Sequence, residues 1–469
     1  MTEGGLKRIS GRVVGIAIAA ALGGFLFGYD TSVINGAVDA LAADFDLGAG
    51  LKGFSVSIAL LGAALGAWFA GSIANRWGRV PVMLWAAALF FVSSILSGLA
   101  FSVWDLMVWR AVGGLGVGAA SVIAPAYIAE VSPARIRGRL GSLQQLAIVL
   151  GIFAALLTNA VLAATSGGAA ETFWFGIETW RWMFIAEAVP AVVYGLMSLR
   201  LPESPRYLVR KGDYDKASQV LLDFSGEPDV NLKIQQIKDS LNLEKRESMA
   251  DLLGPVLGLK PIVWVGVLLS VFQQFVGINV IFYYSTTLWR SVGFDENSAL
   301  LTSVITSVTN IAVTIVAILL VDRVGRKALL LAGSVLMTLS LGVMALAFSF
   351  ATTAADGSVS LEGAWSIIAL IAANLFVVGF GTTWGPVVWV LLGEMFPNRI
   401  RASALAVAAA AQWVANFAIS TTFPWLSGIS LTLAYGLYAA FSLVSFFFVW
   451  LKVRETKGME LESMDELGR

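Results

Sequence analysis

Long apolar runs alternate with short polar segments along nearly the whole chain of 469 residues. Each run has about 20 residues, which is the length a helix needs to cross the roughly 30 Å hydrocarbon layer of a bilayer. We therefore expect an all-α polytopic membrane protein with twelve transmembrane helices. The predicted spans are 13–36, 52–74, 80–100, 105–128, 139–163, 181–200, 261–287, 298–320, 327–350, 364–392, 402–425 and 430–451.

One long polar and charged stretch separates the sixth run from the seventh. Within it, amphipathic spacing predicts short helices at about 214–224 and 232–243. The pattern divides the chain into two six-helix bundles joined by a cytoplasmic helical linker. The expected domains are 1–200 (N-terminal bundle), 201–260 (linker), 261–451 (C-terminal bundle) and 452–469 (cytoplasmic tail).

Short polar phrases appear twice, about half a chain apart and in the same order. Such repetition indicates two related halves, and in a membrane protein it is typical of transporters built from parallel repeats. We interpret the charged members as ion pairs that form in one gate state and break in the other. The repeated residues are Asn75, Arg76 and Arg79 against Asp322, Arg323 and Arg326; Glu130 and Arg137 against Glu394 and Arg401; and, more weakly, Glu203-Ser204 against Glu455-Thr456.

Composition supports a membrane protein and argues against a polyanionic partner. The chain is 58% hydrophobic and 13% charged, whereas a soluble domain has about a quarter charged residues. Net charge is zero, so we expect no nucleic-acid partner. Nearly all Lys and Arg residues fall in segments that the predicted spans place on the same side of the membrane as the N-terminus. Basic residues favour the cytoplasmic side, so both termini are predicted to be cytoplasmic. The first apolar run is expected to be retained as a span in the cell (inner or plasma) membrane.

The chain has no cysteine and no histidine. These absences exclude a disulfide framework, a thiol nucleophile and a cysteine metal site, and they remove the usual neutral-pH proton carrier. No clustered carboxylates with metal spacing are visible either. We expect no enzyme activity, no cofactor and no metal, and any proton handling must use a carboxylate.

Two opposite charges lie inside predicted spans of the N-terminal half. Asp30 is in the first span and Arg110 in the fourth, and both are expected at similar depth in the outer half. An isolated charge in lipid is costly, so the two are natural partners. They form either a static ion pair or a proton-coupling pair in which Asp30 gains and loses a proton. Glu187, close to Arg181, is interpreted as a near-interface residue rather than a transport residue.

Carboxamide side chains gather in four spans: Gln144 and Gln145, Gln273, Gln274 and Asn279, Asn310, and Gln412 with Asn416. Amides both donate and accept hydrogen bonds, which suits a neutral, hydroxyl-rich ligand better than an ion. Aromatic residues at similar depth offer flat faces to a sugar ring: Phe380, Trp384, Trp389 and Trp413. The alternative is that the amides join helices and the aromatics serve only packing or the interface belt.

Several motifs together resemble the sugar porter family of the major facilitator superfamily. They are Gly28-Tyr29-Asp30, the two Arg-x-Gly-Arg loops, Pro202-Glu203-Ser204-Pro205-Arg206, Gln273-Gln274-x-x-Gly277-Ile278-Asn279, Gly385-Pro386-Val387-Val388-Trp389 and Glu455-Thr456-Lys457-Gly458. The resemblance covers essentially the whole chain. Within the family it is strongest to bacterial glucose permeases, notably of cyanobacterial type, and to proton-coupled xylose and galactose symporters.

The resemblance implies a role for each matching residue. Asp30 would couple to protons with Arg110 as its partner, and Tyr283 and Tyr284 would form an outer gate. The chain departs from the family at Asn75, where many members have aspartate, and at Gly381, where facilitative animal carriers have glutamate. The sugar would be held or enclosed by Gln145, Gln273, Gln274, Asn279, Asn310, Phe380, Trp389, Gln412, Trp413 and Asn416.

These patterns predict a monomeric carrier that imports a neutral monosaccharide, glucose being the first choice, by alternating access with proton symport. A proton-independent uniporter of the same fold remains open as an alternative. A sugar sensor, a membrane enzyme and a multidrug exporter are the further alternatives. They are disfavoured by the short tail, the lack of a catalytic constellation and the amide-rich interior, respectively.

Overall fold

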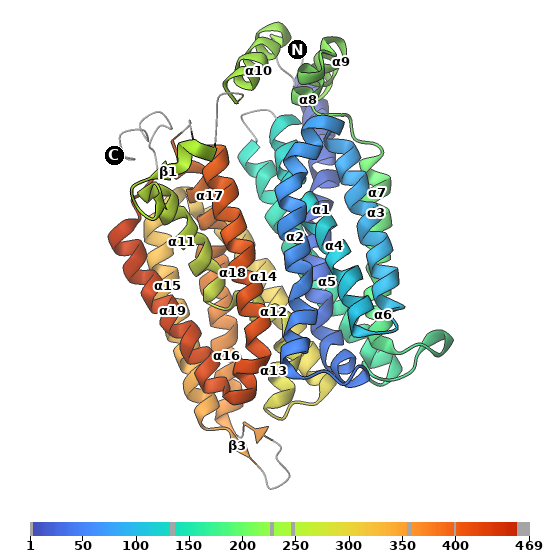
Figure 1. Ribbon diagram of the computed structural model, residues 1–469, viewed down its shortest axis with the longest axis vertical. Helices are drawn as coiled ribbons and strands as arrows, with labels where there is room; N and C mark the ends of the chain where they lie inside the picture. Colours follow the sequence, from blue (N-terminus) through green and yellow to red (C-terminus); the bar gives the residue numbers. More distant parts are fainter. Residues whose placement is uncertain are drawn as a thin grey trace. The chain divides into compact units, whose positions relative to one another are not determined.

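The computed structural model describes residues 3–131, 137–225, 229–244, 249–353, 359–361, 363–397 and 400–456. These residues are mostly helical (Figure 1). The chain separates into two compact units. Unit 1 comprises Met1–Asp30, Gly62–Gly151 and Phe184–Glu247, and unit 2 comprises Thr31–Leu61, Ile152–Met183 and Ser248–Arg469.

The N-terminal half and the linker contain the first set of elements. In the N-terminal half they are α1 (Glu3–Asp44), α2 (Ala49–Trp77), α3 (Arg79–Gly98), α4 (Val103–Val131), α5 (Arg137–Ser166), η1 (Trp174–Gly176), α6 (Thr179–Ala186) and α7 (Ala188–Ser198). In the linker they are α8 (Pro205–Lys211), α9 (Tyr214–Val220), η2 (Leu221–Ser225), α10 (Val230–Glu244), η3 (Met249–Leu252), β1 (Leu253–Gly254) and β2 (Gly258–Leu259).

The C-terminal half contains the second set. Its elements are α11 (Pro261–Phe275), α12 (Ile278–Tyr283), α13 (Ser285–Ser291), α14 (Glu296–Val324), α15 (Arg326–Ser349), β3 (Thr352–Thr353), β4 (Val359–Ser360), α16 (Ala364–Gly379), η4 (Phe380–Trp384), α17 (Gly385–Met395), α18 (Arg401–Ile429) and α19 (Leu431–Lys452). The two short strand pairs, β1 with β2 and β3 with β4, are antiparallel.

Eleven helices among the described residues are long and apolar enough to cross a membrane. The remaining predicted run, 181–200, forms two shorter helices, α6 and α7, which meet at Glu187. Each of the twelve predicted runs is therefore helical, and the prediction of an all-α polytopic protein is confirmed.

In unit 1, glycine residues let membrane helices pack backbone to backbone. A Cβ atom on Gly118 of α4 would lie 1.9 Å from the carbonyl oxygen of Ala63 in α2. Only a residue without a side chain permits so close an approach, which is the usual way helices associate inside a bilayer. This packing, together with the contact of α3 with α4 and α7, fixes the position of α4 and its buried arginine.

The linker folds into a small helical cluster within unit 1. The predicted helices at 214–224 and 232–243 appear as α9 with η2 and as α10, and α8 precedes them. Ser204 caps α8 by accepting hydrogen bonds from two backbone amides of its first turn. The buried members of the cluster are Leu208, Val209, Ala217, Val220, Leu221, Ile234 and Leu241.

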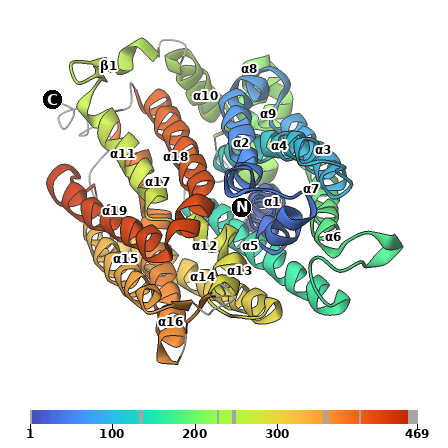
Figure 2. The same ribbon diagram turned by 60° about the horizontal axis from the view of Figure 1, so that its bottom comes forward.

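In unit 2, α15 packs against α16 and α19, and α11 packs against α18 (Figures 1 and 2). The unit also contains one end of α1, α2 and α5. A Cβ atom on Gly53 of α2 would lie 2.2 Å from the carbonyl oxygen of Thr421 in α18. At this end, helices from the two halves of the sequence therefore touch through their backbones.

Two of the spans in unit 2 are interrupted. Gly277 separates α11 from α12 with a left-handed φ of 84°, and an aromatic ring, that of Tyr438, lies 2.7 Å from where its Cβ would be. Phe380–Trp384 forms a π-helical turn between α16 and α17, and Pro386 follows one residue after it. Such turns inside helices frequently occur at functional sites, and discontinuous helices line the substrate sites of many transporters.

Candidate functional site

The predicted pair of Asp30 and Arg110 is present and buried in unit 1. Arg110 Nη1 lies 3.0 Å from Asp30 Oδ1 and also donates to the Asp30 carbonyl oxygen at 3.3 Å. Each residue is 2% exposed. The guanidinium also lies over the ring of Phe184, 5.5 Å from its centroid. The pair is thus enclosed on one side by an aromatic ring and sealed from solvent.

Glu187 belongs to the same charged cluster, which its interpretation as a near-interface residue close to Arg181 did not predict. It is 2% exposed, and it interacts electrostatically with both Asp30 and Arg110. Within the part of the chain that the structure describes, Glu187 Oε1, Asp30 Oδ2 and Arg110 Nε have no hydrogen-bond partner. The cluster therefore holds two carboxyl groups and one guanidinium, with hydrogen-bonding capacity left over.

Amide side chains from α11, α12 and α18 form three hydrogen-bonded pairs in unit 2, which together we call the carboxamide network. Gln412 Nε2 donates to Gln273 Oε1 at 2.7 Å, and Asn279 Nδ2 donates to Gln274 Oε1 at 2.5 Å. Asn416 Nδ2 lies 3.4 Å from the hydroxyl of Tyr283. The structure therefore brings five of the predicted sugar ligands into one unit around the break at Gly277.

Gln273 attaches this network to the π-helical turn. Its Nε2 donates to the carbonyl oxygens of Trp384, at 3.0 Å, and Gly385, at 3.1 Å. The Trp384 indole N–H in turn lies 3.0 Å from both the carbonyl of Leu330 and the hydroxyl of Ser334 in α15. Because Gln273 uses both ends of its amide on protein groups, it holds Gln412 in place. Gln412 Oε1 is buried without a partner among the described residues.

Asn310 lies beside the same turn. A Cβ atom on Gly381 would meet Asn310 Oδ1 at 3.3 Å and Val313 Cγ2 at 2.5 Å. The missing side chain at Gly381, noted as a departure from the animal carriers, is what lets α14 approach the turn this closely. Phe380 begins the turn and contacts Gly385, so it belongs to the same region as the amides.

The remaining residues predicted to bind sugar or to form the outer gate differ in how deeply they are buried. Tyr284 is fully buried, and its hydroxyl donates to the Ser420 carbonyl at 2.8 Å. Tyr283 is 4% exposed, whereas Trp389 in α17 is 40% exposed. Trp413 in α18 is half-buried. Gln145 lies half-buried beside the buried Gln144. Both belong to unit 1, whereas the amide pairs above belong to unit 2.

The repeated polar phrases form two matching clusters, one in each unit. In unit 1, the Arg79 guanidinium makes a two-pronged contact with Glu130, at 2.9 and 2.8 Å. Glu203 accepts from the backbone N–H of Arg79 at 2.9 Å, and Ser204 bonds to Glu130. Asn75 Oδ1 accepts from Arg79 Nη1 at 3.3 Å, so asparagine still contributes a bond where many family members have aspartate.

In unit 2, the Arg326 guanidinium contacts Glu394 at 3.1 and 2.8 Å. Glu455 accepts from the Arg326 backbone N–H at 2.9 Å, and Thr456 Oγ1 donates to Glu394 at 2.6 Å. The glutamates of the weak third repeat, Glu203 and Glu455, thus bind the backbone N–H of the arginine in each cluster. The side chains of Arg137, Asp322, Arg323 and Arg401 lie outside the described residues, and Arg76 has an exposed side chain.

The hydrogen bonds by which Asn35 and Asp39 of α1 bind α12 and α13 in unit 2 were not predicted from the sequence. We call this set of contacts the polar latch. Asn35 is 1% exposed; its Nδ2 donates to the Phe282 carbonyl at 2.7 Å and the Ser285 hydroxyl at 2.9 Å, and its Oδ1 accepts from the Thr286 N–H at 3.0 Å. One turn further on, Asp39 accepts from Thr287 at 2.9 Å and pairs with Lys52 at 2.6 Å. Asn35 is a carboxamide inside an apolar run, and that signal could have flagged it.

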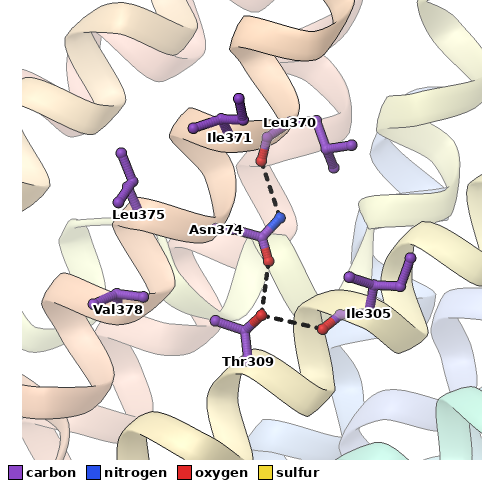
Figure 3. A pocket seen from close by; sticks show the side chains of 7 residues that line it. All are labelled: Ile305, Thr309, Leu370, Ile371, Asn374, Leu375 and Val378. Atoms are coloured by element: carbon purple, nitrogen blue, oxygen red, sulfur yellow. Dashed lines mark hydrogen bonds between the residues drawn. The ribbon is translucent and has the colours of Figure 1, made fainter.

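A separate groove of about 310 Å³ lies between α14 and α16. Figure 3 shows that Asn374 and Thr309 point toward one another within it, with Asn374 Oδ1 3.1 Å from the Thr309 hydroxyl. Asn374 Nδ2 is already bonded to the Leu370 carbonyl at 3.0 Å. The rest of the lining is aliphatic, so this groove does not offer the hydrogen bonds that a sugar requires.

Comparison with known proteins places this geometry in a family. Residues 16–467 match the family described as "Sugar (and other) transporter". The chain is 58% identical to a glucose transport protein of Synechocystis sp. (96% of each chain). It is 38% identical to the D-xylose-proton symporter of Escherichia coli (98% of this chain, 96% of the relative).

Solved structures agree with the sequence comparison. The inward-open xylose transporter XylE from E. coli superposes with a TM-score of 0.81 at 35% identity, covering 97% of this chain and 99% of that one. XylE bound to 6-bromo-6-deoxy-D-glucose gives 0.80 at 36% identity, covering 98% and 100%. On a match that spans almost its whole length, the chain belongs to the sugar (and other) transporter family.

Proposed function

We propose that this protein imports a neutral monosaccharide, glucose first, together with a proton, by alternating access. The observation that carries the proposal is the carboxamide network of unit 2. It is uncharged, it lies at two helix interruptions, and it keeps one buried amide oxygen, Gln412 Oε1, without a partner among the described residues. A hydroxyl donor satisfies such an oxygen, whereas an ion would call for charged ligands. The glucose transport protein at 58% identity supports the choice of hexose.

The sugar ligands in this proposal are Gln145, Gln274, Asn279, Asn310, Trp389, Gln412 and Asn416, with Phe380 and Trp413 shaping the pocket. Gln273 holds Gln412 and the π-helical turn in the arrangement described above. When a sugar binds, Gln273 exchanges one of these protein contacts for a sugar hydroxyl, or it remains a positioning residue. Comparing the binding affinities of Gln273→Leu and Gln412→Leu for deoxy-sugars distinguishes these roles.

Proton coupling rests on the buried cluster of Asp30, Arg110 and Glu187. Two carboxyl groups face one guanidinium in a site sealed from water, and uncompensated charge is expensive there. A proton taken up by the cluster balances its charge and loosens the hold of Asp30 on Arg110. This release permits the change from outward to inward access. The name of the xylose relative, a proton symporter, supports the coupling.

The gating roles follow from the paired clusters and the latch. Two ion pairs, Arg79–Glu130 and Arg326–Glu394, hold helix ends together. We place these helix ends and the chain termini on the cytoplasmic side of the membrane. Tyr283, Tyr284 and Asn35 act at the interrupted helix of unit 2. We further propose that the protein is a monomer in the bacterial plasma membrane.

Uptake of radiolabelled sugar into proteoliposomes tests the function. An inward-directed proton gradient should concentrate glucose inside, and a protonophore should abolish the accumulation. A panel of competing monosaccharides and polyols ranks the substrates. Equilibration of glucose without accumulation would identify a uniporter, and the absence of any saturable sugar flux would refute sugar transport.

A further inference from the structure

The segment between α5 and α6 carries an aromatic hairpin, which we define as residues 172–178. Thr172 pairs with Glu178 in an antiparallel bridge. The Phe173 N–H donates to the Ile177 carbonyl at 2.9 Å, and the Ile177 N–H donates to the Trp174 carbonyl at 3.2 Å. The hairpin lies beside the start of α6 in Figure 1. Its ends are hydrogen-bonded to each other, so it is a folded element rather than an irregular loop.

The tip of the hairpin displays a large apolar side chain at a backbone position that disfavours one. Phe175 has a φ of 58° and Gly176 a φ of 73°. Turns with two left-handed residues usually carry Asn-Gly. Phe175 is 90% exposed and Trp174 is 59% exposed. An unfavourable conformation that holds an aromatic ring outward indicates that the ring has a use there.

The hairpin is attached to α6 through the side chain of Trp182. The Trp182 ring lies 5.7 Å from the Trp174 ring and 6.1 Å from the Phe175 ring, centroid to centroid. The Trp182 indole N–H also donates to the Trp174 carbonyl at 3.2 Å. Trp182 is three residues inside α6, hence about 4.5 Å below its first residue. The aromatic tip is therefore held at the depth of the first turn of the helix.

Charged groups lie at the base of the hairpin. Arg181 pairs with Glu178 at 2.8 Å and with Asp44 at the end of α1 at 3.0 Å. The apolar span of α5 ends close by, at Ser166, and its exposed face includes Leu157 and Val161. The hairpin rings and the outer face of this span are thus both apolar and exposed. The interfacial layer is roughly 5 to 8 Å thick on each side of a bilayer, which matches the depth of the tip.

We propose that the aromatic hairpin inserts into the interface of the lipid bilayer, with Phe175 and Trp174 at the boundary between headgroups and acyl chains. Aromatic rings favour this zone because one part meets apolar chains and another meets water. The polar base of the hairpin is held to α1 by the Arg181–Asp44 ion pair. It therefore fixes how deeply α1 and α6 sit in the membrane at this end. This proposal rests on the membrane-spanning fold and is independent of the sugar site.

Depth-dependent quenching in lipid tests the proposal, and the absence of native cysteine allows single labels. A Phe175→Cys variant of the full chain carries an environment-sensitive fluorophore in phosphatidylcholine–phosphatidylglycerol vesicles. The matched control is Gly48→Cys, an exposed loop position with nothing within 4 Å of an added Cβ. Both variants must retain sugar exchange, so that each label reports on folded protein.

We expect blue-shifted emission at position 175 and stronger quenching by lipids with a shallow acyl-chain nitroxide than by lipids with a deep one. Aqueous iodide should quench the label at position 48 but not the label at 175. Emission at 175 that is as red, and as open to iodide, as that at 48 would overturn the proposal. A blue shift that disappears when the protein is diluted in lipid would also overturn it, because the hairpin would then be contacting a second copy of the chain.

Discussion

Arg110 and Asp30, separated by 80 positions in the sequence, meet at 3.0 Å in a site where both side chains are almost completely buried. Breaking a buried ion pair by removing one partner usually costs several kcal/mol, because the remaining charge loses its counter-charge. In a carrier, protonation of Asp30 would remove its negative charge without a mutation, and it would weaken the ion pair with Arg110 for the same reason. Glu187 adds a second carboxyl group that can take or share that proton.

The first prediction concerns Asp30→Asn. The amide keeps the size of the carboxyl group but cannot ionise, so the cluster is held in its charge-neutralised form. Accumulation of glucose against its gradient should be lost, whereas exchange of labelled for unlabelled sugar should persist. Counterflow and gradient-driven uptake in proteoliposomes measure the two activities separately.

The control for this change is Asp105→Asn, at the start of α4, where the carboxylate accepts from the Trp109 indole outside the cluster. It should accumulate sugar normally. An Asp30→Asn protein that still concentrates sugar would rule out Asp30 as the coupling residue.

The second prediction concerns Gly381→Ala. The added methyl group would lie 2.5 Å from Val313 Cγ2 and 3.3 Å from Asn310 Oδ1, so α14 and its amide must shift. Overpacking of this kind costs about 1–3 kcal/mol, and a loss of about 1.4 kcal/mol in binding weakens affinity roughly tenfold. Sugar affinity, measured by tryptophan fluorescence or calorimetry, should fall accordingly.

Val313→Ala added to Gly381→Ala removes the methyl group that clashes, and it should restore most of the affinity. Gly342→Ala in α15, where nothing lies within 4 Å of an added Cβ, serves as the control and should bind like the unchanged protein. Equal affinities for all of these proteins would mean that Asn310 does not touch the sugar.

The third prediction concerns the bidentate contact of Arg79 with Glu130. Lysine keeps the charge but cannot form the two parallel bonds of a guanidinium. Arg79→Lys should lower the thermal stability of the detergent-solubilised protein, by about 1–3 kcal/mol of unfolding free energy, and slow transport. Arg76→Lys, three positions earlier and exposed, should leave the thermal stability unchanged. If both variants melt alike, the cluster does not hold these helix ends together.

The fourth prediction concerns the latch at Asn35. Asn35→Ala removes three hydrogen bonds to α12 and α13, each worth about 0.5–1.5 kcal/mol. Opening of this region should become at least roughly tenfold more frequent. The measurement is maleimide labelling of Ser32→Cys, because Ser32 is fully buried and its hydroxyl has no hydrogen-bond partner among the described residues.

Ser55→Ala in the same labelling background is the matched control for this experiment, since among the described residues the Ser55 hydroxyl bonds within α2, to the Lys52 carbonyl. It should leave the labelling rate unchanged. If Asn35→Ala also leaves it unchanged, these hydrogen bonds do not limit opening.

Much of this architecture could be predicted from the sequence, because it depends on patterns along the chain. Apolar runs predicted each span, and the isolated charges at Asp30 and Arg110 predicted a pair, because neither is tolerable alone in lipid. The repeated phrases likewise predicted two matching arginine–glutamate contacts. In each case, one strong physical requirement allowed few solutions.

The remainder depends on how helices meet in space. The contact of Glu187 with the charged cluster was not predicted, because its distance from Arg181 along the chain says nothing about which face of the α6–α7 break it occupies. Sequence identified Gln273 as an amide, but not that its hydrogen bonds go to Trp384, Gly385 and Gln412. Asn35 was missed because its three partners lie on helices from the other half of the sequence.

Sugar-induced proton movement tests the central claim most directly. Proteoliposomes with a pH-sensitive dye outside and no imposed gradient are given external glucose. Proton symport predicts that the outside becomes more alkaline as sugar enters, with the response absent for Asp30→Asn and for a non-transported sugar. Saturable glucose entry with no change in external pH would contradict the account.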